Sequence, residues 1–461
     1  MAASKKTTVS PEQQAEFNQA FELLDELVDL LQADELEPLG PGAVYRTSVV
    51  LWMLVYQRLN KNATLDTAVK KLINTAPSLG RDHKRIREKT LSSGTGAYSG
   101  ARQRLTVETT EWFANTVSNS IVATASPSLG KRRAFVIDGT TMTLAPEPAL
   151  RAAFPPASNQ HGEGVWPVAL LLVAHELESG CAMQPEIGAM YGPQAVSEVE
   201  LARASFKRLP PQSIVLGDIN FGIFSVAHAA QQEQQSFLLR LSQSRFKTLC
   251  RQGTLESQGK GWKTWTVRWR PSVKDRKSNP HLTPDVCLEV LVHEVVINPQ
   301  LTLWFVTSLS ESAPLLAELY GRRWEVEIDI RNVKVVLDTE SIRARSVTMF
   351  RKELLTSMVA YNLVVQFRRQ AAGCAKLPVK RLSFTKVWNT YQEFLMKKTY
   401  ATAEEWQEQF EYALSYAQRD KLPNRPGRSF ERVAYSKRPK GSQFPKRVPP
   451  PTPPTNQQSP K

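Results

Sequence analysis

The sequence has few of the residues on which stapled or membrane-bound proteins depend. Its four cysteines are far apart and form no CxxC pair, which argues against a zinc finger and against a disulfide framework. No apolar run approaches the roughly 20 residues of a membrane helix, and Met1 to Ser10 lack the apolar core of a secretory signal. We therefore expect a folded protein of the cytoplasm.

Histidine is equally scarce. The histidines are isolated along the chain, and His175-Glu176 is not followed by the second histidine of a zinc-protease helix. The sequence also contains no internal repeat. Metal or nucleophile chemistry based on histidine is therefore not indicated.

Basic residues, in contrast, are in excess. The 461 residues include 59 Lys and Arg against 44 Asp and Glu, which gives a formal net charge of +15 at pH 7. Such a surplus favours a polyanionic partner, although a basic enzyme without a polymeric ligand has the same composition. The hydrophobic share of 41% is enough to build buried cores.

Helical periodicity dominates the first part of the chain. We predict an amphipathic helix over residues 10–32, a more apolar helix at 47–59 and a third helix at 65–73, followed by a basic run at 81–89. The small, polar segment 92–99 suits a connector or a close approach of backbone to phosphate. These features predict a small helical N-terminal domain.

Beyond this domain, short apolar runs alternate with helical stretches. Runs at 134–137, 168–174 and 214–216 are typical of strands in an α/β fold, and strands dominate from about 237 to 309. The predicted divisions are a helical N-terminal domain at 1–130, the first part of an α/β core at 131–236, a β-rich insertion at 237–304, the second part of the core with C-terminal helices at 305–420, and a tail at 421–461.

The tail carries ten Lys or Arg, one acid and ten prolines. A segment of this composition cannot bury enough apolar surface to fold, so we predict that it is disordered. Basic arms of this kind often add affinity for nucleic acid, but a solvated tail without a role has the same composition.

Two aspartates follow apolar runs of the predicted core. Asp138 ends the run 135–137 and precedes Gly139, and Asp218 follows the run 214–217. Both positions are interpreted as the carboxyl ends of strands, where sites form in α/β sheets. Taken singly, each aspartate is also typical of a turn or a helix N-cap.

The third candidate carboxylate, Glu327, lies in the segment 320–334, which has no proline and is predicted to form one helix. At about 100° per residue, Tyr320, Arg323, Glu327 and Lys334 fall on one narrow stripe. We interpret this stripe as facing a site. The alternative is a surface helix with ordinary pairs such as Arg323 with Glu327.

A second polar stripe on the same segment contains Arg322, Glu325 and Asp329, and apolar residues separate the two stripes. A helix with two polar faces usually turns one of them to solvent and the other to a site. We therefore expect the second stripe to face solvent.

Three carboxylates without a histidine cluster suit hard ions with oxygen ligands, Mg²⁺ or Mn²⁺, rather than zinc. Two such ions about 4 Å apart activate a water or a 3′-hydroxyl and stabilise the departing oxygen of a phosphodiester. The predicted catalytic and metal-binding set is Asp138, Asp218 and Glu327. Beside it, Arg323 would hold phosphate by a fork of hydrogen bonds, Lys334 as a point charge and Tyr320 through its hydroxyl.

The spacing Tyr-(2)-Arg-(3)-Glu-(6)-Lys at residues 320–334, with Asp138-Gly-Thr and Gly217-Asp218 upstream, closely resembles the insertion-sequence-four family of bacterial DDE transposases. The resemblance covers roughly residues 92–384. It implies a ribonuclease H-like catalytic core interrupted by a β-rich insertion between the second aspartate and the glutamate. The N-terminal helical domain, with its basic run, is then the expected reader of DNA ends.

The resemblance also implies partners. These are double-stranded DNA of transposon ends and target, and a second copy of the chain in a homodimer on paired ends, which in a bacterium means a nucleoid-associated location. Some members release their element through a DNA hairpin, with a flipped base stacked on a tryptophan of the insertion. Trp265 is the candidate that we include, although the motif does not choose it over Trp262, Trp269 or Trp304, and core packing is the alternative.

Arginines complete the predicted DNA-binding set. Arg240 lies near the start of the insertion, and Arg343 and Arg345 lie in the basic stretch after the signature segment. Ordinary surface arginines are the alternative. The leading hypothesis is a cut-and-paste transposase; the others are a non-catalytic DNA-binding protein derived from one and a stand-alone metal-dependent nuclease.

Overall fold

The computed structural model describes residues 22–40, 42–60, 63–79, 83–88, 90–160, 162–324, 329, 332, 342–396 and 403–422. The described residues up to Lys421 belong to one compact unit. The predicted disordered tail and most of the helix predicted over 10–32 lie outside the described residues. The same holds for Glu327 and Lys334.

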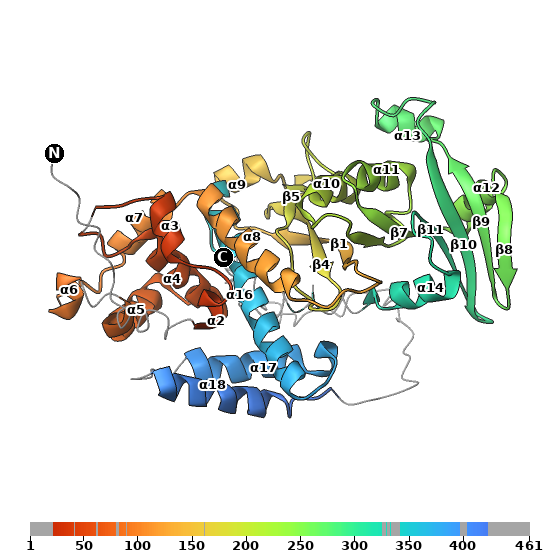
Figure 1. The fold of residues 1–461 in the computed structure, drawn as a ribbon. Helices are drawn as coiled ribbons and strands as arrows, with labels where there is room; N and C mark the ends of the chain where they lie inside the picture. The colour runs from red at the N-terminus through yellow and green to blue at the C-terminus, as the bar shows by residue number, and fades with distance from the viewer. Residues whose placement is uncertain are drawn as a thin grey trace, which may run out of the picture. The chain divides into compact units, whose positions relative to one another are not determined.

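Seven helices that the structure describes precede the sheet (Figure 1). They are α2 (Glu22–Asp25), α3 (Leu31–Leu36), α4 (Thr47–Leu59), α5 (Leu65–Leu79), α6 (Lys84–Arg87), α7 (Gly96–Arg104) and α8 (Val107–Ala123). The helices predicted over 47–59 and 65–73 are confirmed. The predicted helix 10–32 is wrong where it can be compared, because the chain turns between α2 and α3. There the Asp29 carboxylate accepts a hydrogen bond from the Leu31 N–H (3.0 Å), and such a local bond competes with helical pairing.

One nine-stranded sheet forms the centre of the fold, which confirms the predicted α/β class. Its order is β5-β4-β1-β6-β7-β11-β10-β9-β8 (Figure 1). The strands are β1 (Ala134–Thr143), β4 (Val168–Glu176), β5 (Glu186–Ala189), β6 (Ile214–Gly217), β7 (Ser236–Arg240), β8 (Thr254–Gly259), β9 (Trp262–Trp269), β10 (Leu288–Asn298) and β11 (Leu301–Thr307). Two short strands, β2 (Ser158–Asn159) and β3 (Gly162–Glu163), pair with each other.

Strand direction separates two parts of this sheet. β1 is antiparallel to β4 and parallel to β6, and β7 is parallel to β6. β11 is antiparallel to β7, and the strands from β8 to β11 are antiparallel to their neighbours. The β-rich segment therefore extends the edge of the core sheet, and both of its predicted boundaries, 237 and 304, fall within strands. The division into domains stays a prediction.

The remaining helices cover the sheet and follow it. They are α9 (Pro148–Ala153), α10 (Glu198–Ser205), α11 (Phe224–Gln232), α12 (Gln243–Cys250), α13 (Val273–Ser278), α14 (Ala313–Gly321), α16 (Val347–Cys374), α17 (Phe384–Tyr391) and α18 (Ala403–Ala417), with short 3-10 segments η1 (Phe206–Arg208) and η4 (Val379–Arg381) and the π-helical η5 (Gln392–Met396).

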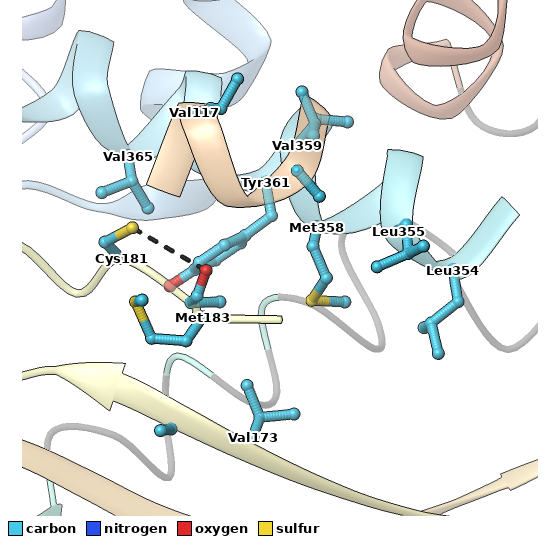
Figure 2. Packing of buried hydrophobic residues seen from close by; sticks show 14 of the residues in the cluster. Val117, Val173, Cys181, Met183, Leu354, Leu355, Met358, Val359, Tyr361 and Val365 are labelled. Atoms are coloured by element: carbon cyan, nitrogen blue, oxygen red, sulfur yellow. Dashed lines mark hydrogen bonds between the residues drawn. The ribbon is translucent and has the colours of Figure 1, made fainter. Parts of the chain in front are cut away.

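The two faces of the sheet have different hydrophobic cores, because successive strand residues point to opposite faces. Phe135 and Ile137 of β1 belong to the larger core, whereas Ala134 and Val136 belong to a smaller core that contains buried residues of α14. In the larger core, α16 lies against α8 and α4. Figure 2 shows its Tyr361 packed with residues that include Cys181 and Met183. The N-terminal helices thus share one continuous core with the sheet.

A buried ion cluster joins the same elements. The Glu353 carboxylate of α16 lies 2.5 Å from Nη2 of Arg102 in α7 and 3.3 Å from Nη2 of Arg58 in α4. Only 4% of the Glu353 and Arg58 side chains and 12% of the Arg102 side chain are exposed. A buried charge is costly unless an opposite charge lies beside it, so this cluster fixes α4 and α7 on α16.

Candidate active site

Asp138 lies inside β1, opposite Val173 of β4, and not at a strand end as predicted. The apolar run is shorter than the strand for a structural reason. Pairing of β1 with β6 ends at Val136, whereas pairing with β4 continues to Thr143. The second half of β1 therefore has a neighbour on one side only, and its residues are less buried than those of the first half.

Asp218 directly follows β6, so its predicted place at the end of a strand is confirmed. In the parallel pair, Val136 lies opposite Leu216, and the same register continued by two residues brings Asp138 beside Asp218. In the next pair, Gly217 lies opposite Leu239, which brings Asp218 beside Arg240. Neighbouring strands are about 4.8 Å apart, so the two carboxylates and the guanidinium form one row across three strands.

Strand alternation also fixes the face of the sheet on which this row lies. Asp138 is two residues beyond Val136, Asp218 two beyond Leu216, and Arg240 two beyond Leu238. Val136, Leu216 and Leu238 all belong to the smaller core, together with residues of α14. The row therefore lies on the face that α14 covers, and α14 leads directly into the signature segment.

Burial and neighbouring charges act on Asp138. The pKa of its carboxyl is raised to about 6, mainly by burial. A hydrogen bond from the Gly139 N–H (2.9 Å) and the charge of Arg323 lower this pKa, and the negative charges of Asp218 and Glu198 add to the increase. A carboxyl with such a pKa is partly protonated near neutral pH. A bound cation would favour its ionised form, because opposite charge nearby stabilises a carboxylate.

The signature segment does not begin as the single helix that was predicted. α14 ends at Gly321, and the N–H groups of Arg322 and Arg323 donate to the carbonyls of Leu319 and Tyr320, three residues back (3.3 and 2.9 Å). This tighter i to i−3 pattern is the usual way in which a helix ends. Tyr320 therefore closes α14, and Arg323 lies in the turn after it.

Tyr320 and Arg323 are in contact. The Arg323 guanidinium lies 5.9 Å from the centre of the Tyr320 ring, a cation–π geometry. The ring packs against Phe305 of β11 (4.8 Å between centroids), and Tyr320 is only 5% exposed. The charges of Arg323 and Arg240 both act on the Tyr320 hydroxyl, and burial raises its pKa. The structure therefore brings Tyr320, Arg323 and Arg240 together with the two aspartates.

Of the second polar stripe, Arg322 and Asp329 are among the described residues. Both form ion pairs, and Asp329 is buried and does not face solvent as expected. Arg322 forms a forked ion pair with Glu178 (2.6 and 3.0 Å), and Asp329, which is 1% exposed, forms an ion pair with Lys380 of η4. Both partners are far away in the sequence, so helical periodicity alone gave no sign of them. The stripe fixes the segment within the protein.

The other predicted DNA-binding residues are more dispersed. Trp265 of β9 packs edge-on against Phe246 of α12 (5.3 Å), as expected for a packing residue. Arg343 and Arg345 are exposed just before α16, and Arg345 lies 3.5 Å from Glu147. Their roles on DNA stay predictions.

Arg245 supports the loop after Asp218. Its guanidinium donates to the carbonyl of Ile219 (2.7 Å) and lies 3.4 Å from the carbonyl of Gly222. A groove of about 810 Å³ opens beside this loop, between α10, α11, α12 and α13. The charged residues that line it are the basic Arg203, Arg245 and Lys274 and the acidic Glu200 and Asp275.

Glu198 is a neighbour of both aspartates that the sequence analysis did not single out. The signal was Ser197 followed by Glu200, a capping box that starts a helix and places Glu198 in its first turn. Within the described residues, no three His, Cys, Asp or Glu side chains already form a complete metal cluster. The donors at this edge are nevertheless all carboxylates, a set that fits hard divalent ions.

These features, a mixed sheet with paired aspartates at one edge and an arginine-bearing turn over them, are those of a phosphodiester-processing enzyme. The transposase DDE domain family matches residues 129–363, just over half of the chain. The protein therefore belongs to the DDE transposase family, which implies the ribonuclease H-like core.

A curated relative agrees with this assignment. The chain is 25% identical over 359 residues to "Transposase InsG for insertion sequence element IS4" from Escherichia coli (strain K12), an alignment that covers 74% of this chain and 78% of that protein. The resemblance to transposases of the insertion-sequence-four type is thus confirmed. The protein is a transposase, an enzyme that acts on DNA, and DDE transposases generally use divalent metal ions. Among the helices of the described residues, none is long and apolar enough to cross a membrane.

Proposed function

We propose that this transposase acts by cut-and-paste: it hydrolyses DNA strands at transposon ends and uses the freed 3′-hydroxyls to attack target DNA. The observation that carries the proposal is the row of Asp138, Asp218 and Arg240, which strand register and alternation place on one face of the sheet. Asp138 and Asp218 of this row, with Glu327 as the third ligand, would hold two Mg²⁺ or Mn²⁺ ions. When bound, such ions activate the attacking oxygen and stabilise the leaving one.

The chain's own residues would then position the DNA. Arg323 offers two parallel N–H groups to a phosphate, and the buried Tyr320 ring below it limits the orientations of the guanidinium. Lys334 would add a point charge, and the Tyr320 hydroxyl a further phosphate contact. Arg240, next to Asp218, would hold the neighbouring phosphate.

The partners follow from this reaction. Both transposon ends must be cut, so we propose a homodimer on paired ends. The N-terminal helical region, which carries the basic run at 81–89 but an acidic first segment, is the proposed reader of end sequence. The groove beside the Asp218 loop is the proposed path of a DNA strand that leaves the site, with Arg203, Arg245 and Lys274 as its phosphate contacts.

Cleavage of a duplex that carries the terminal sequences of the element tests the proposal. In Mg²⁺, the wild-type protein should nick this duplex, and Asp138→Asn and Glu327→Gln should each lower the rate by roughly 10³-fold or more, since each removes a ligand of the ions that stabilise the transition state. Binding of the same duplex in a gel shift should persist. Asp285→Asn, at a fully exposed carboxylate, and Glu289→Gln, at a side chain 82% exposed, are the matched controls and should cleave normally.

Retained cleavage in Asp138→Asn would overturn the assignment. A strand-transfer assay with pre-cleaved ends and a plasmid target separates the transposase from the nuclease. A protein that nicks ends but never joins them to the plasmid is a nuclease.

A further inference from the structure

We propose that Glu198 is an additional carboxylate of the metal site, which reaches the Asp138–Asp218 edge from the opposite face of the sheet. The inference rests on the proposed function, because it takes that edge as the metal site.

The first observation is the fit between Glu198 and Gly139. A Cβ added to Gly139 would overlap the Glu198 carboxyl group and lie 2.7 Å from its Cγ. The residue after Asp138 therefore has no side chain at the place where the Glu198 carboxylate lies. Any larger residue would force this carboxylate away from Asp138.

The second observation is the position of α10. The pairing of β1 with β6 ends at Val136, so Asp138 and Gly139 are paired with β4 but not with β6. The buried residues Leu201 and Ala202 anchor α10 in the larger core, and the Ser197–Glu200 capping box fixes where the helix begins. Glu198, the first residue of α10, is thereby held at the open edge.

The third observation is the surroundings of the Glu198 carboxylate. Among the residues that the structure describes, none donates a hydrogen bond to it and none forms an ion pair with it, while its charge acts on both Asp138 and Asp218. Three carboxylates brought together in this way repel one another. Arg323 offsets part of this repulsion at Asp138, and a divalent cation would offset it further.

The mode of contact follows from the geometry. The described carboxylates do not converge into a ready three-ligand cluster, and Mg²⁺ retains several waters when it binds proteins through one or two carboxylates. Glu198 would therefore contact such an ion mainly through bound water. Such outer partners contribute about 10- to 100-fold in metal affinity.

Mn²⁺ binding to the full-length protein without DNA, followed by electron paramagnetic resonance, tests the inference. Glu198→Gln should raise the Kd for Mn²⁺ about tenfold. Gly139→Ala should act in the same direction, because its methyl displaces Glu198 while every carboxylate stays in the chain. Glu200→Gln is the matched control: it removes the same charge from the same helical turn, but its carboxylate caps α10, so its Kd should stay within about twofold of wild type.

Thermal unfolding without metal checks the fold of each variant, and Glu198→Gln should be at least as stable as wild type, because it removes repulsion. An unchanged Kd in Glu198→Gln, with binding lost in Asp138→Asn, would overturn the role of Glu198 and leave the proposed function standing. Equal Mn²⁺ binding by wild type and Asp138→Asn would instead overturn the carboxylate site itself, and the role of Glu198 with it.

Discussion

The buried Glu353 cluster gives the most quantitative prediction. Glu353→Ala leaves the cations of Arg58 and Arg102 without this carboxylate, although both side chains are almost entirely buried. Burial already lowers the pKa of Arg58, and Glu353 opposes this effect. Removal of one partner from a buried ion cluster lowers the free energy of unfolding by about 3–5 kcal/mol. With an unfolding entropy of about 2.1 cal/mol/K per residue over roughly 400 residues, a loss of about 4 kcal/mol lowers Tm by about 5 °C.

Differential scanning fluorimetry of the purified protein measures this shift. The matched control is Glu289→Ala, which removes a carboxylate 3.9 Å from Arg268 in an exposed pair, with 70% and 82% of the side chains exposed. An exposed pair contributes about 0–1 kcal/mol, so this variant should shift Tm by about 1 °C or less. Equal shifts in the two variants would refute the reasoning, because burial is the only difference on which the larger value depends.

Three further predictions concern the segments around the site. Lys380→Met leaves the Asp329 carboxylate buried without its cation. Urea titration should show a free energy of unfolding lower by about 3–5 kcal/mol. The double variant Asp329→Asn with Lys380→Met should recover most of this loss, because it removes the buried charge as well. Burial lowers the pKa of His175 to about 4, below its unfolded value of 6.5, so protonation favours the unfolded chain. The free energy of unfolding of the wild type should therefore fall by about 3 kcal/mol between pH 6.5 and pH 4, a loss that His175→Gln should not show. Parallel pH profiles of the two proteins would contradict this. Arg245→Met removes the hydrogen bond that holds the loop after Asp218, and should slow DNA cleavage roughly tenfold while the affinity for DNA in a gel shift stays nearly unchanged. A loss of affinity alone would show that Arg245 acts on DNA and not on the loop.

The sequence predicted most of the fold because its signals are local. The apolar runs before Asp138 and Asp218 marked two neighbouring core strands, and helical periodicity located α4 and α5. It could not show that β1 continues past Asp138, since that half of the strand is held only by its long-range pairing with β4. It also placed the boundaries of the insertion within β7 and β11, because a strand that extends a core sheet has the same pattern as one in a separate sheet.

The sequence likewise predicted part of the candidate site and missed the part that depends on long-range contacts. The order Asp, Asp and then Tyr-Arg-Glu-Lys was enough to identify the family from residue spacing alone. The pairing of Asp329 with Lys380, the support of Arg323 by Tyr320, and the approach of Glu198 to Gly139 depend on contacts between segments far apart in the chain. Spacing along a chain determines which residues one helix or strand can present together. Only the packing of those elements decides which charges lose contact with water, and therefore which of them need a partner or an ion.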